Sequence, residues 1–484
     1  MSDGVVLGQR NVSQDAVILV PGIMGSRLRL RESGDVVWGL DLSWYSGAWF
    51  RNEPWRQLAV TDAERDGQTN RVVADGLIDD VAFAPVLGGF LPYQAIGRRI
   101  RSLLADPAGY LELGYDWRLS ATHNAGLLAE TVERHITAWR AHPSAIAAQR
   151  SRPDQRAPQV ILVAHSMGGL VCRAMYAIPG AADDVRAILT LGTPFRGAAQ
   201  AAVILASGQG TPFPLPRKRL RRMAKTLPGL HDLLPVYRSV DEGHDVRRLT
   251  DADIAAIGGD VDLGRESRDR HAALAGVRLP GHQAYIGGFQ PTPSTLRLSG
   301  GEVVAEAYSY LVSSDGSLVR DATSGDPRQV IRFGDGTVPL ASALPDTITA
   351  VTVSQQHGSL ARVEEALSQA AAILLEEDRA VQHLGESELG FDLPDLVEVN
   401  TVVSVPLTGQ DAAGATCTLY DETGHDIAHP PVKLRAGQRV VDILCPSPGI
   451  HRLEVQGGGS GPVGQSVLAH HPSFGEPDDE PGDN

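Results

Sequence analysis

The sequence predicts an α/β protein with a mostly parallel central sheet, followed by a small β-sandwich. Short, continuous apolar runs at 17–20, 159–164 and 187–191 are typical of strands buried inside a parallel sheet, and they alternate with segments of helical pattern. After about residue 392 the helical segments end, and short strand-like runs separated by Gly, Pro and Asp turns follow. That texture is typical of a β-sandwich.

The other elements of the α/β part follow from the same patterns. We expect further strands at 111–115, 282–288 and 348–354, and helices at 94–105, 122–148, 168–177 and 359–377. Strands that alternate with helices build a parallel sheet, so functional side chains are expected at the carboxyl ends of its strands.

The chain has 484 residues, which is enough for two or three domains. We expect an α/β domain over 1–380, a β-sandwich over 392–472 and an acidic, Pro-rich, disordered tail over 473–484. Within the first domain, a stretch rich in Pro, Arg and Leu at about 198–281 breaks the alternation of strands and helices. An insertion of this kind is predicted to form a cap over the site.

Bulk composition excludes several classes of protein. The net charge of −15 argues against nucleic-acid binding. Cys172, Cys417 and Cys445 do not make a disulfide framework, which fits a reducing compartment; we predict small buried apolar residues, with a Cys417–Cys445 pair as the alternative. Neither a signal peptide nor a membrane-spanning run of roughly 18 apolar residues is apparent. We therefore expect a cytoplasmic protein, with peripheral contact to a membrane surface left open.

Ser166 is the strongest candidate for a catalytic residue. The segment 163–168, Val-Ala-His-Ser-Met-Gly, follows an apolar run and has the pattern of a nucleophile elbow, Gly-x-Ser-x-Gly, with Ala164 at the first glycine position. Small residues two positions either side of the serine let the sharp turn form without collision. A serine presented in this way can be deprotonated by a histidine and attack an ester carbonyl. An ordinary Ser-Gly turn is the alternative.

A serine nucleophile on such a sheet needs an acid and a histidine later in the chain. Asp335, with glycines on both sides in the segment 333–339, is predicted to orient the histidine, although Asp-Gly is also a common hairpin turn. His357 is predicted to be the base, because it follows the expected strand at 348–354 and precedes a helix. His165 is predicted to pack and hydrogen-bond, with its side chain pointing away from the pocket.

The oxyanion hole is predicted to use two backbone N–H groups. One is that of Met167, directly after the nucleophile, and the other comes from the Pro-Gly-Ile-Met-Gly turn after the first strand, with Ile23 preferred and Met24 as the alternative. No His/Cys cluster has the spacing of zinc ligands, and the G-x-G-x-x-G pattern at 459–464 contains Pro462 and precedes no helix. We therefore predict no metal and no cofactor.

Five segments together resemble the lecithin:cholesterol acyltransferase family, whose wider group includes phospholipid:diacylglycerol acyltransferases and lysosomal phospholipase/transacylases. The segments are 17–25, 115–119 (Tyr-Asp-Trp-Arg-Leu), 164–168, 191–197 and 334–338, with His357 where the family has its histidine. The resemblance spans roughly residues 15–375. It implies an α/β-hydrolase fold with a lid and cap, chemistry on acyl esters of lipids, and Ser166, Asp335 and His357 as the catalytic triad.

The resemblance also implies that Asp116 and Arg118 are neighbours of the active site, with a structural salt bridge as the equal alternative. Two features depart from the family's pattern. The disulfides and signal peptide of its secreted members are missing, and the β-rich C-terminal unit is additional. Both departures bear on the identity of the substrate more than on the triad.

Two segments are candidates for lipid contact. Trp38, Trp44, Trp49 and Trp55 fall within 18 residues, in a region where the family has a mobile lid; aromatic rings suit an apolar–water boundary, and packing onto the core is the alternative. The basic run at 217–222 is predicted to form a solvated helix face, with contact to anionic headgroups as the alternative. The residues predicted to contact substrate are Met24, Trp44, Trp49, Asp116 and Phe195.

These observations predict a serine-dependent lipid acyl-ester hydrolase or O-acyltransferase that works through an acyl-enzyme intermediate, on phospholipid or other long-chain esters. A carboxylesterase of small esters is one alternative. The other is a hydrolase effector that is tethered to protein partners through residues 392–472.

Overall fold

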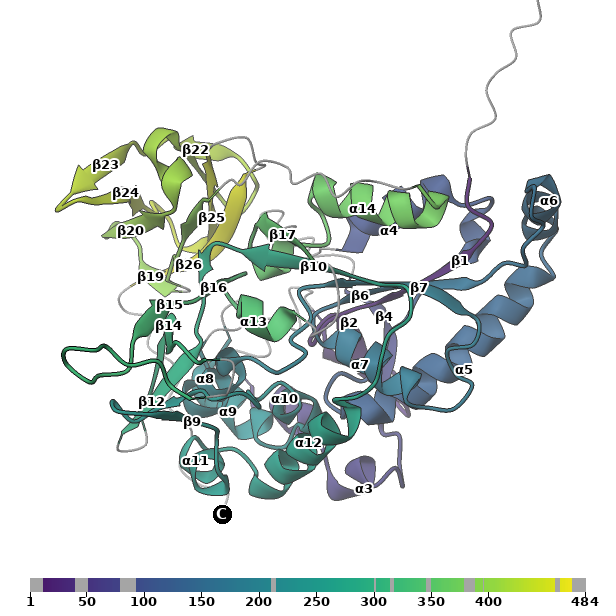
Figure 1. Ribbon diagram of the computed structural model, residues 1–484, viewed down its shortest axis with the longest axis horizontal. Helices are drawn as coiled ribbons and strands as arrows, with labels where there is room; N and C mark the ends of the chain where they lie inside the picture. Colours follow the sequence, from purple (N-terminus) through teal and green to yellow (C-terminus); the bar gives the residue numbers. More distant parts are fainter. Residues whose placement is uncertain are drawn as a thin grey trace, which may run out of the picture.

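The computed structural model describes residues 12–39, 51–78, 93–209, 215–299, 302–313, 317–344, 350–377, 388–394, 396–457 and 462–471. At its centre lies a six-stranded sheet with the order β17-β10-β7-β6-β1-β5 (Figure 1). Every neighbouring pair in this sheet is parallel. The strands are β1 (Ala16–Val20), β5 (Tyr110–Glu112), β6 (Val160–His165), β7 (Val185–Leu191), β10 (His282–Gly288) and β17 (Ala350–Ser354).

The apolar strands place alternate side chains in two cores, one on each face of the sheet. Ile18 and Leu162 belong to the core that is covered by α5 (Ala121–Arg140) and α7 (Met167–Tyr176). Leu19 and Val163 belong to the other core, under α4 (Tyr93–Leu103) and α14 (Glu364–Leu375). Helices therefore cover both faces, as Figure 1 shows. The predicted α/β-hydrolase fold class is confirmed.

Two of the predicted helices were wrong in their bounds. The stretch at 122–148 forms two helices, α5 and α6 (Pro143–Ser151), because Pro143 supplies no backbone N–H to continue a helix and instead suits its first turn. The helix expected from residue 359 begins at Glu364, after a short 3-10 turn at His357–Ser359. No helix in the described part of the chain combines the length and apolarity that a membrane crossing would need.

The predicted insertion follows β7 and is mostly helical. It contains α8 (Ala199–Ser207), α9 (Arg217–Ala224), α10 (Pro228–His231), β8 (Val240–Asp241), β9 (Val246–Arg247), α11 (Asp251–Ala256) and α12 (Val261–Leu274). Within α9, Arg219, Leu220 and Met223 are buried, whereas Lys218 and Arg221 are exposed. The basic run is therefore an amphipathic helix, and its contact with anionic headgroups stays a prediction.

A second insertion, which the sequence patterns did not reveal, lies between β10 and the Asp335 loop. It contains β11 (Gln290–Pro291), β12 (Thr295–Ser299), β13 (Glu302–Glu306), β14 (Tyr308–Tyr310), β15 (Gln329–Ile331) and β16 (Phe333–Gly334). The strand β12 pairs with β13 and with β8, so strands from both insertions form one four-stranded sheet, β13-β12-β8-β9. The cap is therefore made of two separate stretches of chain.

A small antiparallel sheet near the first strand holds part of the aromatic segment. It contains β2 (Ser26–Leu30), β3 (Val36–Trp38) and β4 (Val72–Leu77), next to α2 (Glu53–Leu58) and α3 (Asp62–Arg65). Trp38 and Trp55 are buried, and the Trp38 ring meets the edge of Trp117 with centroids 5.0 Å apart. The packing interpretation holds for these two rings; Trp44 and Trp49 lie outside the described residues.

The C-terminal region is all β, as predicted. One sheet has the order β18-β20-β24-β23 and the other β19-β26-β25-β21-β22, and the two share a hydrophobic core of their own. Cys417 and Cys445 are buried in that core as free thiols. The strands are β18 (Gly390–Phe391), β19 (Leu396–Glu398), β20 (Val402–Thr408), β21 (Thr416–Tyr420), β22 (Asp426–Ala428), β23 (Val432–Arg435), β24 (Gln438–Leu444), β25 (Gly449–Gln456) and β26 (Val463–His470). The predicted acidic tail lies outside the described residues.

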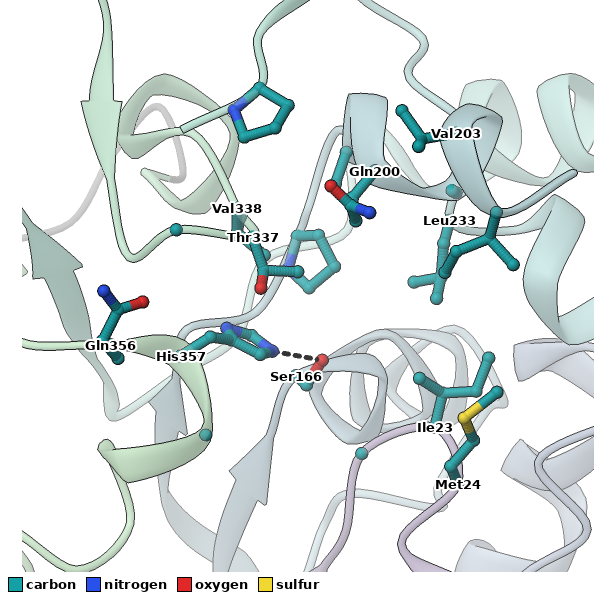
Figure 2. Close-up of a pocket in the computed structure, with 18 of the residues that line it drawn as sticks. Ile23, Met24, Ser166, Gln200, Val203, Leu233, Thr337, Val338, Gln356 and His357 are labelled. Carbon is teal, nitrogen blue, oxygen red and sulfur yellow. Dashed lines mark hydrogen bonds between the residues drawn. The ribbon is translucent and has the colours of Figure 1, made fainter. Parts of the chain in front are cut away.

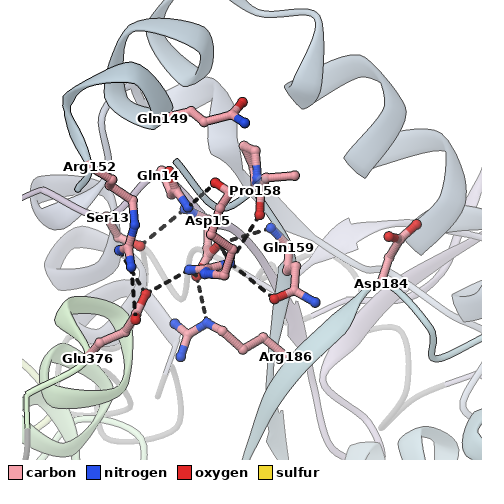
Figure 3. A network of polar contacts seen from close by, with 12 residues as sticks. Ser13, Gln14, Asp15, Gln149, Arg152, Pro158, Gln159, Asp184, Arg186 and Glu376 are labelled. Atoms are coloured by element: carbon pink, nitrogen blue, oxygen red, sulfur yellow. Dashed lines mark hydrogen bonds and ion pairs between the residues drawn. The ribbon is translucent and has the colours of Figure 1, made fainter. Parts of the chain in front are cut away.

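Charged side chains fasten the amino ends of the central strands. Asp15, fully buried, accepts hydrogen bonds from both Nη groups of Arg156 at 2.9 Å and from Nε of Arg186 at 2.7 Å. Arg156 also pairs with Glu376, just beyond α14, at 2.7 Å (Figure 3). This network joins the starts of β1 and β7 to the end of α14, on the edge of the sheet opposite the carboxyl ends.

A second ionic network is centred on a fully buried arginine. The Arg118 guanidinium, with no exposed side-chain area, donates to both carboxylate oxygens of Asp116 (2.9 and 2.7 Å) and to Glu64 (2.8 Å). Its Nη1 donates to the carbonyl of Leu58 at 3.1 Å. Although burial acts to raise it, the pKa of Glu64 is held below its usual value, chiefly by Arg118. The segment after β5 is thus tied to α2 and α3.

We expect Arg118→Met to lower the free energy of unfolding by about 3–5 kcal/mol, because Asp116 loses its partner and the buried Glu64 keeps only Arg71. The matched Arg27→Met removes a half-exposed arginine paired with Asp75 and should cost about 1 kcal/mol or less. Urea unfolding of both variants measures the difference. Equal effects would contradict the structural role of Arg118.

Candidate active site

Ser166 stands at a sharp bend between β6 and α7. Its backbone has φ 51° and ψ −125°, a combination that strains a residue with a side chain. The bend requires empty space around it: a Cβ on Gly22 would lie 2.8 Å from Cβ of Ser166, and one on Gly168 would lie 2.5 Å from the carbonyl oxygens of Val20 and Pro21. Gly168 of the sequence motif is therefore in a place where a side chain would collide, and so is Gly22 in the turn after β1.

The three residues predicted as a triad meet at the carboxyl ends of the strands. The Ser166 hydroxyl donates to Nε2 of His357 at 2.9 Å, and Nδ1 of His357 donates to Oδ2 of Asp335 at 2.6 Å. Figure 2 shows the serine and histidine facing each other at the cavity floor. A hydroxyl, an imidazole and a carboxylate in this line can move a proton from the hydroxyl to the imidazole.

The Asp335 carboxylate is fixed before any substrate arrives. It is fully buried, and its Oδ1 accepts hydrogen bonds from the backbone N–H groups of Thr337 (3.0 Å) and Val338 (2.7 Å). The backbone N–H of His357 donates to the carbonyl of Asp335 at 2.8 Å. The Asp-Gly turn, with Gly336 at φ 87°, thus orients the Asp335 carboxylate toward His357.

Two further glycines, which sequence reasoning missed, make room for the acid and the histidine. A Cβ on Gly192 would lie 2.9 Å from Oδ2 of Asp335 and 3.0 Å from Nδ1 of His357. A Cβ on Gly287 would lie 2.4 Å from Cβ of Asp335. Both glycines are at the carboxyl ends of strands, Gly192 just past β7 and Gly287 in β10. In the sequence, the only indication of this role is that each glycine lies at or near the carboxyl end of a predicted strand.

His165 connects the turn after β1 to the loop of His357. The Tyr93 hydroxyl accepts from the N–H of Gly22 (2.8 Å) and donates to Nδ1 of His165 (3.0 Å). Nε2 of His165 then donates to the carbonyl of His357 at 3.1 Å. His165 is buried and hydrogen-bonded as expected, but it lines the cavity instead of pointing away from it, because this contact turns it toward the His357 loop.

Burial, together with the neighbouring His357, lowers the pKa of His165 to about 3. The imidazole is therefore neutral throughout the neutral and mildly acid range. A neutral ring fits its network, in which Nδ1 accepts one hydrogen bond and Nε2 donates the other.

Of the two residues predicted to supply oxyanion donors, Ile23 lines the cavity and Met167 lies beside Ser166 in the chain. Met167 begins α7 directly after Ser166, where a backbone N–H has no partner within the helix. Ile23 lies in the turn after β1, which is closed by a hydrogen bond from Gly25 N–H to the carbonyl of Gly22 at 3.1 Å. Met24, at φ 63°, follows Ile23, and Figure 2 shows both beside Ser166. Their role as donors stays a prediction.

A cavity of about 610 Å³ opens above Ser166. Its apolar wall comes from the turn after β1 and from both insertions, and it includes Ile23, Met24, Val203, Ile204, Leu230, Leu233, Val303 and Ala305. In Figure 2, Ile23, Met24 and Leu233 lie on one side of Ser166, and His357 and Gln356 lie on the other. The cavity therefore has an apolar side and a histidine side.

Only some of the residues predicted to contact substrate line the cavity. Met24 lines the cavity, but Asp116 and Phe195 do not. The Asp116 carboxylate is bound to Arg118, so the salt-bridge alternative describes it. Phe195 is buried, packed edge-on against His282 with centroids 5.6 Å apart. Trp44 and Trp49 lie outside the described residues. Among the residues that are described, no group of three His, Cys, Asp or Glu side chains gathers as metal ligands.

The parallel sheet, the serine at the bend after β6, and the acid and histidine after later strands define the α/β-hydrolase class. Within it, the model of a family described as the PGAP1-like alpha/beta domain matches residues 108–204, a span that holds β5, β6, β7 and Ser166. This match supports the broader class and does not name the lecithin:cholesterol acyltransferase family, whose resemblance stays a prediction. No curated protein matches the chain.

Several solved structures have remote likeness to this chain. The Tle4–Tli4 complex contains a chain with 17% identity and a TM-score of 0.48, covering 75% of this chain and 97% of its own. The mature lipase BlEst2 of Bacillus licheniformis has 13% identity, coverages of 75% and 92%, and a TM-score of 0.34. The phospholipase PlaB of Legionella pneumophila has 10% identity, coverages of 96% and 90%, and a TM-score of 0.23. The functional argument therefore depends on the site itself.

The low pKa of His165 predicts an acid-sensitive fold. The unfolded histidine takes up a proton near pH 6.5, whereas the folded one does so only near pH 3. Its contribution to stability is therefore complete above about pH 6.5 and is lost as the pH falls toward 3, at up to about 1.4 kcal/mol per pH unit.

Unfolding free energies measured between pH 7 and pH 4 test this. His165→Gln, which cannot titrate, should show a shallower pH slope than the wild type, and His123→Gln, at an exposed position, should keep the wild-type slope. A wild-type slope in His165→Gln would show that His165 is not the group responsible.

Proposed function

We propose that the chain is a serine-dependent lipid acyl-ester hydrolase or O-acyltransferase that works through an acyl-enzyme intermediate. The observation that carries the proposal is the 2.9 Å contact between Ser166 and His357, backed by the buried Asp335, at the floor of a cavity with an apolar wall. A hydroxyl, an imidazole and a carboxylate beneath an apolar wall suit an ester whose acyl part is a hydrocarbon chain.

In the proposed reaction, Nε2 of His357 takes the proton from Ser166 as Oγ bonds to the ester carbonyl carbon. The carbonyl oxygen becomes an oxyanion, which the N–H groups of Met167 and Ile23 would stabilise. The intermediate then releases the alcohol, which receives the proton from His357. Asp335 holds the imidazole in orientation and stabilises its charged form.

The second half of the reaction runs the same steps with a new nucleophile. His357 deprotonates water or an acceptor hydroxyl, which attacks the acyl-Ser166 ester, and Ser166 leaves with its proton restored. Hydrolase and transferase differ only in whether an alcohol outcompetes water at this step. A cavity covered by a cap favours transfer to the extent that it keeps water out.

A long acyl chain is favoured over a small ester by the extent of the apolar wall. Two insertions and the turn after β1 contribute to it, and each methylene buried there is worth about 0.8 kcal/mol. An enzyme for small esters has no need of such a surface.

The alternative of a hydrolase tethered by its C-terminal region finds less support. Residues of that region, including Asp392, Arg452 and Gln465, line the cavity above Ser166. Gln355 donates to the carbonyl of Pro462 at 3.2 Å, so the region also holds the loop before His357. We propose that residues 392–472 complete the enzyme, and binding of protein partners by them stays a prediction.

We expect Ser166→Ala to lower kcat on a chromogenic long-chain acyl ester by at least about 10⁴-fold, because it removes the nucleophile. Ser102→Ala, at an exposed serine of α4, is the matched control and should leave kcat unchanged. Turnover by pure Ser166→Ala protein at the wild-type rate would contradict the proposal.

A series of acyl chain lengths distinguishes lipid esters from small ones. We expect kcat/KM of the wild type to rise with chain length, because each added methylene meets the apolar wall. Highest activity on short chains, with no response to lipid vesicles, would favour the small-ester alternative.

A further inference from the structure

An arginine without a carboxylate partner lies next to the proposed active site. Arg362 follows His357 by five residues and lines the same cavity. Its Nη2 donates to Oγ of Ser359 at 3.0 Å, and among the ion pairs of the described residues none involves Arg362. Burial, with a further contribution from the nearby Arg452, lowers the pKa of Arg362 to about 10, although the carboxylate of Glu454 acts to raise it. The group is still cationic at neutral pH, although it is largely withdrawn from water.

A second arginine reaches the same region from the C-terminal sheet. Arg452 on β25 lines the cavity together with Gly464 of the adjacent strand β26. A Cβ on Gly464 would lie 2.6 Å from Nη2 and 2.8 Å from Nε of Arg452, so the guanidinium occupies the space that a side chain at 464 would fill. Arg452 also pairs with Glu454 at 2.5 Å.

The carboxylates nearby do not cancel both arginines. Glu454 is engaged by Arg452. Asp392 also lines the cavity, and burial raises the pKa of its carboxyl, which disfavours its charged form; it makes no ion pair with Arg362 among the described residues. Arg362 is half-buried and lines the cavity, and none of the ion pairs of the described residues gives it a carboxylate of its own. A charge that is partly withdrawn from water is costly unless something pairs with it, which points to an anionic ligand.

The chemistry of the site says which part of the substrate would meet these arginines. The histidine that protonates the leaving alcohol must lie on the alcohol's side of the reacting carbon. Four residues of the apolar wall, Ile23, Met24, Val203 and Leu233, lie on the other side of Ser166 from His357 and Gln356 (Figure 2). The acyl chain then lies along the apolar wall, and the alcohol part extends past His357 toward the segment that carries Arg362.

We propose that Arg362, assisted by Arg452, forms a subsite for a phosphodiester on the alcohol part of the ester. This inference rests on the proposed function and narrows its substrate class to acyl esters with an anionic alcohol part. Guanidinium groups suit the role because their N–H donors can bind two phosphate oxygens at once. Arg362 comes from the α/β domain and Arg452 from the C-terminal sheet, so the subsite exists only where the two regions meet.

Binding to catalytically inert protein tests the subsite apart from the chemistry. We would titrate Ser166→Ala protein with monomeric dihexanoylphosphatidylglycerol and with the uncharged dihexanoylglycerol, by calorimetry at concentrations below micelle formation. The phosphodiester should bind more tightly than the uncharged lipid. Adding Arg362→Gln should weaken its binding by about 10- to 100-fold, the range for a lost hydrogen bond to a charged group.

Two further variants control for folding and for general charge. Gly464→Ala keeps every charge but adds a methyl that meets the flexible end of Arg452, and it should weaken phosphodiester binding several-fold in a protein that still folds. Arg435→Gln removes a half-exposed arginine of the same C-terminal region, paired with Asp442, and should leave the preference unchanged.

Hydrolysis by protein with Ser166 intact gives the second readout. The ratio of kcat/KM for the phosphodiester lipid to that for dihexanoylglycerol should fall about 10- to 100-fold in Arg362→Gln. An unchanged ratio would overturn the subsite while leaving the proposed function in place. Absence of Ser166-dependent hydrolysis of either lipid would instead overturn the proposed function. In that case the calorimetry would still test the subsite, because equal binding of both lipids by the Ser166→Ala protein would refute the phosphodiester subsite.

Discussion

The backbone bend at Ser166 is the constraint on which the rest of the site depends. The serine adopts φ 51° and ψ −125° in a closely packed setting, where a side chain on Gly22 would collide with it and one on Gly168 would collide with the carbonyl oxygens of Val20 and Pro21. The bend lifts Oγ above the carboxyl edge of the sheet, where it meets His357 at 2.9 Å. The strain is opposed by the buried strands β1 and β6 and by α7, whose packing fixes the turn between them.

The local parts of this arrangement could be predicted from the sequence, and the long-range parts could not. The bend at Ser166, the Asp335 turn and the position of His357 depend on short patterns that are bounded by apolar runs. Gly192 and Gly287 matter because of side chains that are distant along the chain, so no local pattern marks them. The second insertion was missed for a related reason, since one of its strands, β12, pairs with β8 of the first insertion. The family resemblance implied that Asp116 is a neighbour of the active site, but its carboxylate forms an ion pair with Arg118 instead of lining the cavity.

The C-terminal region is joined to the active site by polar contacts as well as by the cavity lining. Gln356, next to His357, donates to Oε1 of Gln290 (3.0 Å) and to the carbonyl of Phe391 (3.3 Å). Gln290 in turn donates to the carbonyl of Leu389 at 2.8 Å. These amides, of which Gln290 is fully buried, connect the start of the β region to the loop of His357. In the proposed enzyme, a region placed in this way would contact the alcohol part of the substrate and also hold the loop of His357, the proposed base.

The central claim is that Ser166 is a nucleophile activated by His357 and Asp335. Mass spectrometry of the intact protein, and then of its peptides, after reaction with a fluorophosphonate probe tests it most directly. The account predicts one adduct, on the peptide containing Ser166, and its loss in a folded His357→Ala variant. An adduct on another residue, or labelling of Ser166 that is unaffected by His357→Ala, would contradict it.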